Sequence, residues 1–255
     1  MTLRTPRTSD VRVVSAAGAR SASIDGLLVA AWIALCAAGI VGCGERTAVE
    51  RGEELFRDPR LSPSPTSSVS CRTCHTPGPA TADEILPGGS LAGVVGRPTF
   101  WGGRVRDLRQ AINDCLRFFM RHPSEEGLTE TDPDGLDLLA YLESLGTEPS
   151  EPVPFTVPLD VVDLTPGDAA RGEPIYDAAC RTCHGAPHTG RGRLVAQAAV
   201  IPEDTITEHA ELARAFTVAK VRHAQFFGIG GDMPPFSLEV LSDEQLSDLV
   251  AYLGY

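Results

Sequence analysis

One pentapeptide occurs twice in this chain, as Cys71-Arg72-Thr73-Cys74-His75 and as Cys180-Arg181-Thr182-Cys183-His184. The two cysteines of each copy are three positions apart, so on one helical turn both thiols face the same side. The histidine that follows each pair adds an imidazole beside the thiols. Two identical copies, more than one hundred residues apart, indicate that the chain binds the same chemical group twice.

The pattern C-x-x-C-H is typical of covalent attachment of a c-type haem. The thiols bind the porphyrin edge, and His75 and His184 are expected as axial ligands of the two irons. A thiol redox pair needs no histidine after it, and a zinc site would require both copies to converge on one metal. We therefore predict two covalent c-type haems, each attached through a pair of cysteines: Cys71, Cys74, Cys180 and Cys183.

Composition limits the possible partners of the chain. The 255 residues carry a formal net charge of −12, which argues against nucleic acid, because nucleic-acid binding needs a basic face. The same charge favours a redox-partner protein with a basic docking face. Aromatic residues make up only 6%, so we expect aliphatic side chains and the porphyrins to supply much of the core.

The N-terminal segment predicts export. Residues 1–26 are polar and carry arginines, and residues 27–42 form an apolar run that is short for a spanning helix. The run ends in Ile40-Val41-Gly42-Cys43, which resembles a bacterial lipobox, and this resemblance implies that Cys43 is the lipidated first residue of the mature protein. By the same resemblance, Gly44 after it implies the outer membrane. The alternatives are a plain signal peptide or an uncleaved anchor, and in the preferred case the protein lies in the periplasm of a bacterial cell envelope.

An internal repeat extends beyond the pentapeptide. Residues 51–56 (RGEELF) correspond to residues 171–176 (RGEPIY), and residues 138–142 (LLAYL) to residues 249–253 (LVAYL). Each half therefore has a first helix, a haem motif, a loop-rich middle and a final helix. This order resembles the class I cytochrome c fold over nearly all of residues 46–255. The resemblance implies an all-α protein with two tandem cytochrome c-like domains, each with a few helices around one haem.

The predicted organisation has four parts. A lipoprotein signal peptide covers residues 1–42, and the first cytochrome c domain covers residues 43–148. A Pro-rich linker, residues 149–165, reads as an extended spacer. The second domain covers residues 166–255.

The ends of the helices are marked by local signals. Ser242 and Gln245 have the spacing of a capping box for the last helix. In the first half, Asp132 and Pro133 suit the start of the final helix and Gly146 suits its end. Two glycines at matching positions, Gly52 and Gly172, are expected to let each first helix approach Tyr141 or Tyr252 of the last one closely.

The sixth ligand of the second haem is predicted from a methionine loop. Met233-Pro234-Pro235-Phe236 resembles the loop that carries the axial methionine in class I cytochromes c. The prolines restrict the backbone, so the thioether is presented with little conformational freedom left to lose. A neutral thioether favours ferrous iron and raises the reduction potential.

The first half has no such loop, and three residues compete for its sixth position. Met120 lies 21 positions before Tyr141, close to the 19 positions between Met233 and Tyr252, and is the preferred ligand. Cys115 is the main alternative, because residues 112–115 (INDC) resemble a stretch of thiosulfate-oxidising di-haem cytochromes in which that cysteine ligates iron. Otherwise Cys115 is a small buried residue on a helix stripe. His122 is a further alternative. Elsewhere, His209 and His223 are expected on the polar face of a helix at about residues 207–225.

Three functions follow from these features. The preferred one is a membrane-tethered di-haem cytochrome that carries electrons between redox partners and is not itself an enzyme. The second is a di-haem peroxidase, because residues 52–62 (GEELFRDPRLS) and 100–104 (FWGGR) resemble stretches of bacterial cytochrome c peroxidases. The third is a sulfur-compound-oxidising cytochrome, a hypothesis that depends on Cys115. Since a fold does not establish a reaction, both enzymatic alternatives stay open.

Overall fold

The computed structural model describes residues 45–147, 151–160, 164–202, 212–227 and 230–255. The expected signal segment and the lipidated Cys43 lie outside these residues. The chain divides into residues 1–45 and residues 46–255, and the description below concerns the second unit alone. Among its described residues, no helix combines the length and the apolar character that crossing a membrane requires.

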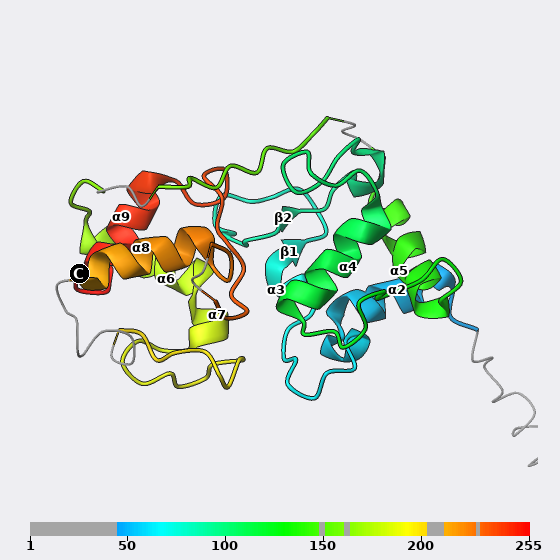
Figure 1. Ribbon diagram of the computed structural model, residues 1–255, viewed down its shortest axis with the longest axis horizontal. Coiled ribbons are helices and arrows are strands. Elements are labelled where there is room, and N and C mark those ends of the chain that lie inside the picture. Colours follow the sequence, from blue (N-terminus) through cyan, green and yellow to red (C-terminus); the bar gives the residue numbers. More distant parts are fainter. Residues whose placement is uncertain (1–44, 148–150, 161–163, 203–211, 228–229) are drawn as a thin grey trace, which may run out of the picture. The chain divides into compact units, whose positions relative to one another are not determined.

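Helices dominate the structure, as Figure 1 shows. In chain order the elements are α2 (Ala48–Arg57), the 3-10 helix η1 (Pro59–Leu61), α3 (Cys71–Cys74), β1 (His75–Thr76), β2 (Gly89–Ser90), the 3-10 helix η2 (Val94–Gly96), α4 (Leu108–Phe119), α5 (Pro133–Ser144), α6 (Ala169–Ala179), α7 (Arg181–His184), α8 (Ala213–His223) and α9 (Asp243–Tyr252). The two short strands pair in parallel, with His75 opposite Gly89. The predicted all-α class is confirmed.

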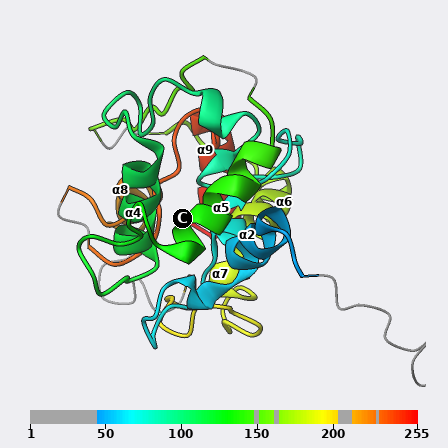
Figure 2. The same cartoon turned by 90° about the vertical axis from the view of Figure 1, so that its right-hand side faces the viewer.

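The first and last helices of each half pack against each other, α2 on α5 and α6 on α9 (Figure 2). A β-carbon at Gly52 would lie 2.0 Å from the carbonyl oxygen of Asp137 and 2.6 Å from Cβ of Tyr141. A β-carbon at Gly172 would lie 2.1 Å from the carbonyl oxygen of Asp248 and 2.6 Å from Cβ of Tyr252. The predicted close approach at the two glycines is therefore confirmed in both halves.

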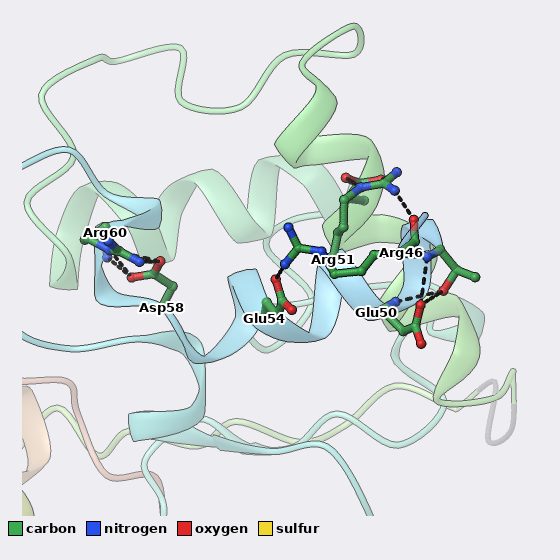
Figure 3. A network of polar contacts seen from close by, with 8 residues as sticks. Arg46, Glu50, Arg51, Glu54, Asp58 and Arg60 are labelled. Atoms are coloured by element: carbon green, nitrogen blue, oxygen red, sulfur yellow. Dashed lines mark hydrogen bonds and ion pairs between the residues drawn. The ribbon is translucent and has the colours of Figure 1, made fainter. Parts of the chain in front are cut away.

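Local capping fixes the helix ends. The first helix, α2, begins with a capping box in which Glu50 N–H donates to Thr47 Oγ1 at 3.2 Å and Thr47 N–H donates to the Glu50 carboxylate at 2.8 Å. Near this cap, the Arg46 side chain forms an ion pair with the Glu54 carboxylate, as Figure 3 shows. The predicted box of Ser242 and Gln245 at the start of α9 is present.

The end signals of α5 behave as expected. Asp132 accepts a hydrogen bond from Asp134 N–H at 3.0 Å, and Pro133 is the first residue of the helix. Gly146 follows the helix with a φ of +93°, a conformation that favours glycine after a helix end. Polar and conformational signals in the sequence thus place this helix correctly.

The described residues form two apolar cores, one built mainly by each half, and Ile85 of the first half belongs to the second core. In the first core Phe56 and Tyr141 lie with ring centroids 5.4 Å apart, and Leu116, Met120 and Leu138 are buried with them. In the second core Tyr176 and Tyr252 lie 5.8 Å apart, at the same interplanar angle of 49° as the first pair. Figure 1 shows the helices that carry these rings, α2 and α5 in one half and α6 and α9 in the other. The repeat seen in the sequence is therefore also a repeat of packing.

The expectation for His223 is wrong. The helix that carries it, α8, is described from Ala213 to His223, and His209 lies outside the described residues. His223 is buried rather than on a polar face, and its Nε2 lies 2.7 Å from the carbonyl oxygen of Pro158. Because the linker segment returns to cover α8, a position that looks exposed on an isolated helix becomes enclosed.

Candidate haem-binding sites

The first motif forms a single helical turn, α3. The backbone N–H of Ser70 donates to Thr73 Oγ1 at 3.0 Å, which starts the turn, and Cys71 and Cys74 then follow on one face. Burial raises the pKa of the Cys71 thiol to about 11 and that of Cys74 to about 12. The side chains of Cys71 and Cys74 therefore lie together on one turn, the placement that attachment to one porphyrin edge requires.

His75 follows the turn in an extended conformation and its imidazole is enclosed. Burial lowers its pKa to about 4, against the opposing effect of the nearby backbone of Gly89 and Gly88. The ring lies directly against Gly88, where a β-carbon would be 2.2 Å from Cε1 of His75. Within the described chain its Nδ1 is buried without a well-formed hydrogen bond. The imidazole is thus kept neutral, which is the form that binds iron.

The second motif continues the chain from α6 into α7. Cys180 is buried, and burial raises the pKa of its thiol to about 12 and also raises the pKa of Cys183. His184 Nδ1 lies 2.9 Å from the carbonyl oxygen of Ala199. This contact orients the ring and leaves Nε2 for a metal, as in other metal-bound histidines. Burial also lowers the pKa of His184, which favours the neutral ligand.

Hydrogen bonds with residues of α8 hold the methionine loop of the second half in place. Met233 packs against the same core cluster as Cys180. After the two prolines, Phe236 N–H donates to the carbonyl oxygen of Val221 at 3.0 Å. The buried guanidinium of Arg222 donates through Nη1 to the carbonyl oxygens of Phe236 at 3.0 Å and of Leu241 at 2.6 Å. Arg222 has no signal of its own in the sequence, since only the folded loop brings these carbonyl groups to it.

Two of the three candidates for the sixth ligand of the first haem, Met120 and Cys115, lie near the first motif. Met120 caps the end of α4 and is buried in the core cluster against which Cys71 packs. Burial raises the pKa of the Cys115 thiol, and the adjacent thiols of Cys71 and Cys74 raise it further. The His122 side chain faces its own turn, with Nδ1 3.2 Å from Ser124 N–H. The structure thus brings Met120 and Cys115, but not His122, to the attachment thiols.

The residues present fit two c-type haems. None of the five cysteines that the structure describes is in a disulfide, so both pairs are available for thioether bonds. Each pair is followed by an imidazole whose pKa is lowered by burial, and one cysteine of each pair shares a core with a methionine.

Two similarities to known proteins agree with these donor sets. Residues 167–253 match the family described as cytochrome c oxidase, cbb3-type, subunit III. The chain is also 28% identical over 224 residues to a protein named thiosulfate dehydrogenase from Allochromatium vinosum, an alignment that covers 79% of this chain and 77% of that protein. Together with the donor sets, these similarities support a c-type cytochrome that transfers electrons through haem. The family match includes the second motif only.

Proposed function

We propose that this protein is a two-haem cytochrome that oxidises a small sulfur anion of the thiosulfate type at its first haem and passes the electrons out through its second. The observation that carries this proposal is the position of Cys115, a half-buried thiol near both attachment thiols of the first motif. The name of the Allochromatium vinosum relative supports the choice of substrate. A haem bound in each half supplies one-electron redox chemistry.

The position of Cys115 on α4 supports this role. On α4, Ile112 lies one turn before Cys115 and packs against the first core, so the thiol faces the interior of the same half. Asn113 is held apart from it, since its side chain donates to the carbonyl oxygens of Glu126 at 2.9 Å and Leu128 at 3.0 Å. A helix face fixed in this way keeps the thiol at the first motif, where as thiolate it would lower the potential of an iron that it ligates.

Met120 is the competing ligand, and its position supports a different function. A thioether at the first iron would raise its potential, and both haems would then suit simple transfer of electrons between proteins. The two ligand sets therefore correspond to the two functions. Oxidation of two thiosulfate ions joins two sulfur atoms and releases two electrons without release of protons, so two one-electron centres match the stoichiometry.

The second haem is proposed as the exit. Its ligands are His184, oriented by the carbonyl of Ala199, and Met233 on the proline loop. A methionine ligand favours ferrous iron, so this haem can accept electrons from a first haem of lower potential. The net charge of −12 supports delivery to a protein with a basic docking face.

The cellular location is proposed from the sequence. We infer a periplasmic protein of a bacterial envelope, tethered by lipid on Cys43 and facing the periplasm from the outer membrane. The variant Cys43→Ser should move the protein from the membrane to the soluble fraction. Retention of the variant in membranes would favour an uncleaved anchor instead.

The experiment that tests the activity mixes purified ferric holoprotein with thiosulfate and follows haem reduction by visible absorbance. The wild type should be reduced, and Cys115→Ala should lose this reaction while it keeps two haems per chain and full reduction by dithionite. Met120→Ala is the matched control and should keep the reaction. A wild type that ignores thiosulfate but exchanges electrons with small redox proteins would be a carrier, and one that consumes hydrogen peroxide would be a peroxidase.

A further inference from the structure

An ion pair joins the segments that carry the two candidate methionine ligands. Arg121 directly follows Met120, and Asp232 directly precedes Met233. Arg121 Nε donates to Asp232 Oδ2 at 2.7 Å, and Nη2 donates to the same oxygen. Residues from the two halves, 111 positions apart, are thus connected one residue away from each methionine.

Further contacts surround this pair. The side-chain amide of Gln225, just after α8, donates through Nε2 to the carbonyl oxygen of Phe118 at 2.7 Å. The ring of Phe226 lies edge-on to Phe118, with centroids 5.5 Å apart, and to Phe119, with centroids 6.3 Å apart. The end of α4 therefore meets the segment after α8 through a hydrogen bond and two ring contacts, and the ion pair adds a charged contact next to Met233.

The backbone of Arg121 is strained. Its φ is +54°, in the left-handed region where glycine and asparagine are favoured and a long side chain is disfavoured. The conformation is held by the end of α4, where His122 N–H donates to the carbonyl oxygen of Leu116 at 3.0 Å. An arginine at a position better suited to glycine points to a use for its side chain, and the contact that this side chain makes is with Asp232.

A second cation lies near Asp232 within its own half. Lys220 on α8 donates through Nζ to the carbonyl oxygens of Gly230 and Ala224. Burial lowers the pKa of Lys220, and the nearby Asp232 carboxylate opposes this effect. Lys220 holds the segment before Met233 through contacts within the second half alone. Removal of Arg121 therefore reports the contribution of the contact between the two halves.

We propose that Arg121 and Asp232 are positioning residues, through which the first half holds the Met233 thioether at the second haem. This inference rests on the proposed ligation of that haem by Met233. The pair is partly exposed, with 37% of the Arg121 side chain and 39% of the Asp232 side chain accessible. Exposed pairs contribute modestly, so loss of the pair should weaken Met233 ligation severalfold and should not abolish it.

The test measures how easily imidazole displaces methionine from the ferric holoprotein, followed by loss of the long-wavelength sulfur-to-iron band. Imidazole above its own pKa is neutral, so its binding reports displacement of the thioether with little direct effect of charge. Arg121→Gly and Asp232→Asn should each tighten imidazole binding at the second haem severalfold. Arg121→Gly also relieves the strained backbone, so the variant should fold and keep two haems.

Matched variants complete the design. Arg121→Lys keeps the charge and should stay near the wild type. Arg109→Gln removes the ion pair between Arg109 of α4 and Glu130, 2.8 Å apart and both within the first half, and should change nothing. The double variant Arg121→Gly/Asp232→Asn should match a single one. Additive effects, or imidazole affinities equal to the wild type, would overturn the positioning role. If Met233→Ala leaves the band unchanged, the proposed ligation itself is wrong.

Discussion

Arg171 and Asp248 form a two-point ion pair between the first and last helices of the second half. Arg171 Nε donates to Asp248 Oδ2 at 2.7 Å, and Nη2 donates to Oδ1 at 2.8 Å. The backbone N–H of Asp168 donates to the same Oδ1 at 2.6 Å. The first half repeats the pair at matching positions, with Arg51 and Asp137 at 2.6 and 2.8 Å. Each glycine-mediated helix crossing is thus closed by a paired carboxylate.

The pair in the second half should make stability depend on pH. The hydrogen bond from Arg171 holds the pKa of Asp248 below its ordinary value of 3.8. A carboxyl whose pKa is lower in the folded state stabilises the fold above its ordinary pKa, and this contribution is lost as the pH falls through the folded pKa. Asp248→Asn should therefore lower Tm at neutral pH, and the difference from the wild type should shrink below about pH 4.

Thermal unfolding of the holoprotein between neutral and acidic pH measures this difference. The control is Asp177→Asn, which removes an exposed ion pair between Asp177 of α6 and Arg181 of α7. Such pairs contribute little to stability, so its Tm should follow that of the wild type. If the difference in Tm between Asp248→Asn and the wild type stays constant down to acidic pH, the carboxylate charge is not the source of that difference.

Gly172→Ala should destabilise the protein, because the new methyl group would lie 2.1 Å from the carbonyl oxygen of Asp248. The helices α6 and α9 would have to move apart, and overpacking of this kind costs about 1–3 kcal/mol. Denaturant unfolding gives the free energy directly. Gly78→Ala is the matched control, since nothing lies within 4 Å of a β-carbon there. Equal free energies of unfolding for the two variants would show that α6 and α9 accommodate the added methyl group without cost.

Local signals in the sequence predicted the helix crossings well. The caps at Asp132 and Ser242 depend on neighbouring residues, and the contacts of Gly52 and Gly172 follow from a repeat in which each glycine has a matching tyrosine. The carboxylates Asp137 and Asp248 could have been found too, because each lies four positions before its tyrosine.

Contacts made through loops could not be predicted. The pairing of Arg121 with Asp232 and the burial of His223 under the carbonyl of Pro158 depend on where irregular segments return to the helices. Periodicity carries no information about such segments. For the same reason the spacing to Tyr141 favours Met120 at the first haem, whereas the folded helix brings Cys115 to the attachment thiols as well.

Gly88→Ala should impair the first haem and leave the second intact. A methyl group at this position would lie 2.2 Å from Cε1 and 2.5 Å from Nδ1 and Nε2 of the enclosed His75 ring. The ring would have to tilt, so the expected result is loss or altered ligation of one haem of two. Haem content per chain and the visible spectrum measure this, with Gly78→Ala again as the control. A variant with two normal haems would mean that His75 can move without effect on ligation.

The sixth ligand of the first haem separates the two functions most directly, and replacement of each candidate should identify it. If Cys115 ligates, Cys115→Ala should raise the potential of one haem, because a thiolate stabilises ferric iron and its loss removes that effect. Met120→Ala should then leave the sulfur-to-iron band of Met233 unchanged and mainly open a cavity in the first core, which for a buried methionine costs about 2–5 kcal/mol of stability.

Ligation of the first haem by Met120 would instead support the function of an electron carrier. If Met120 ligates, the ferric protein should show a long-wavelength band that fits two methionine-ligated haems, and Met120→Ala should remove about half of it. Cys115→Ala should then leave both potentials unchanged. A redox titration followed optically records both quantities in each variant, with Met233→Ala as the reference for loss of the second methionine. If neither first-half variant alters a potential or the band, the sixth position of the first haem is open, and peroxide binding at that iron becomes the decisive measurement.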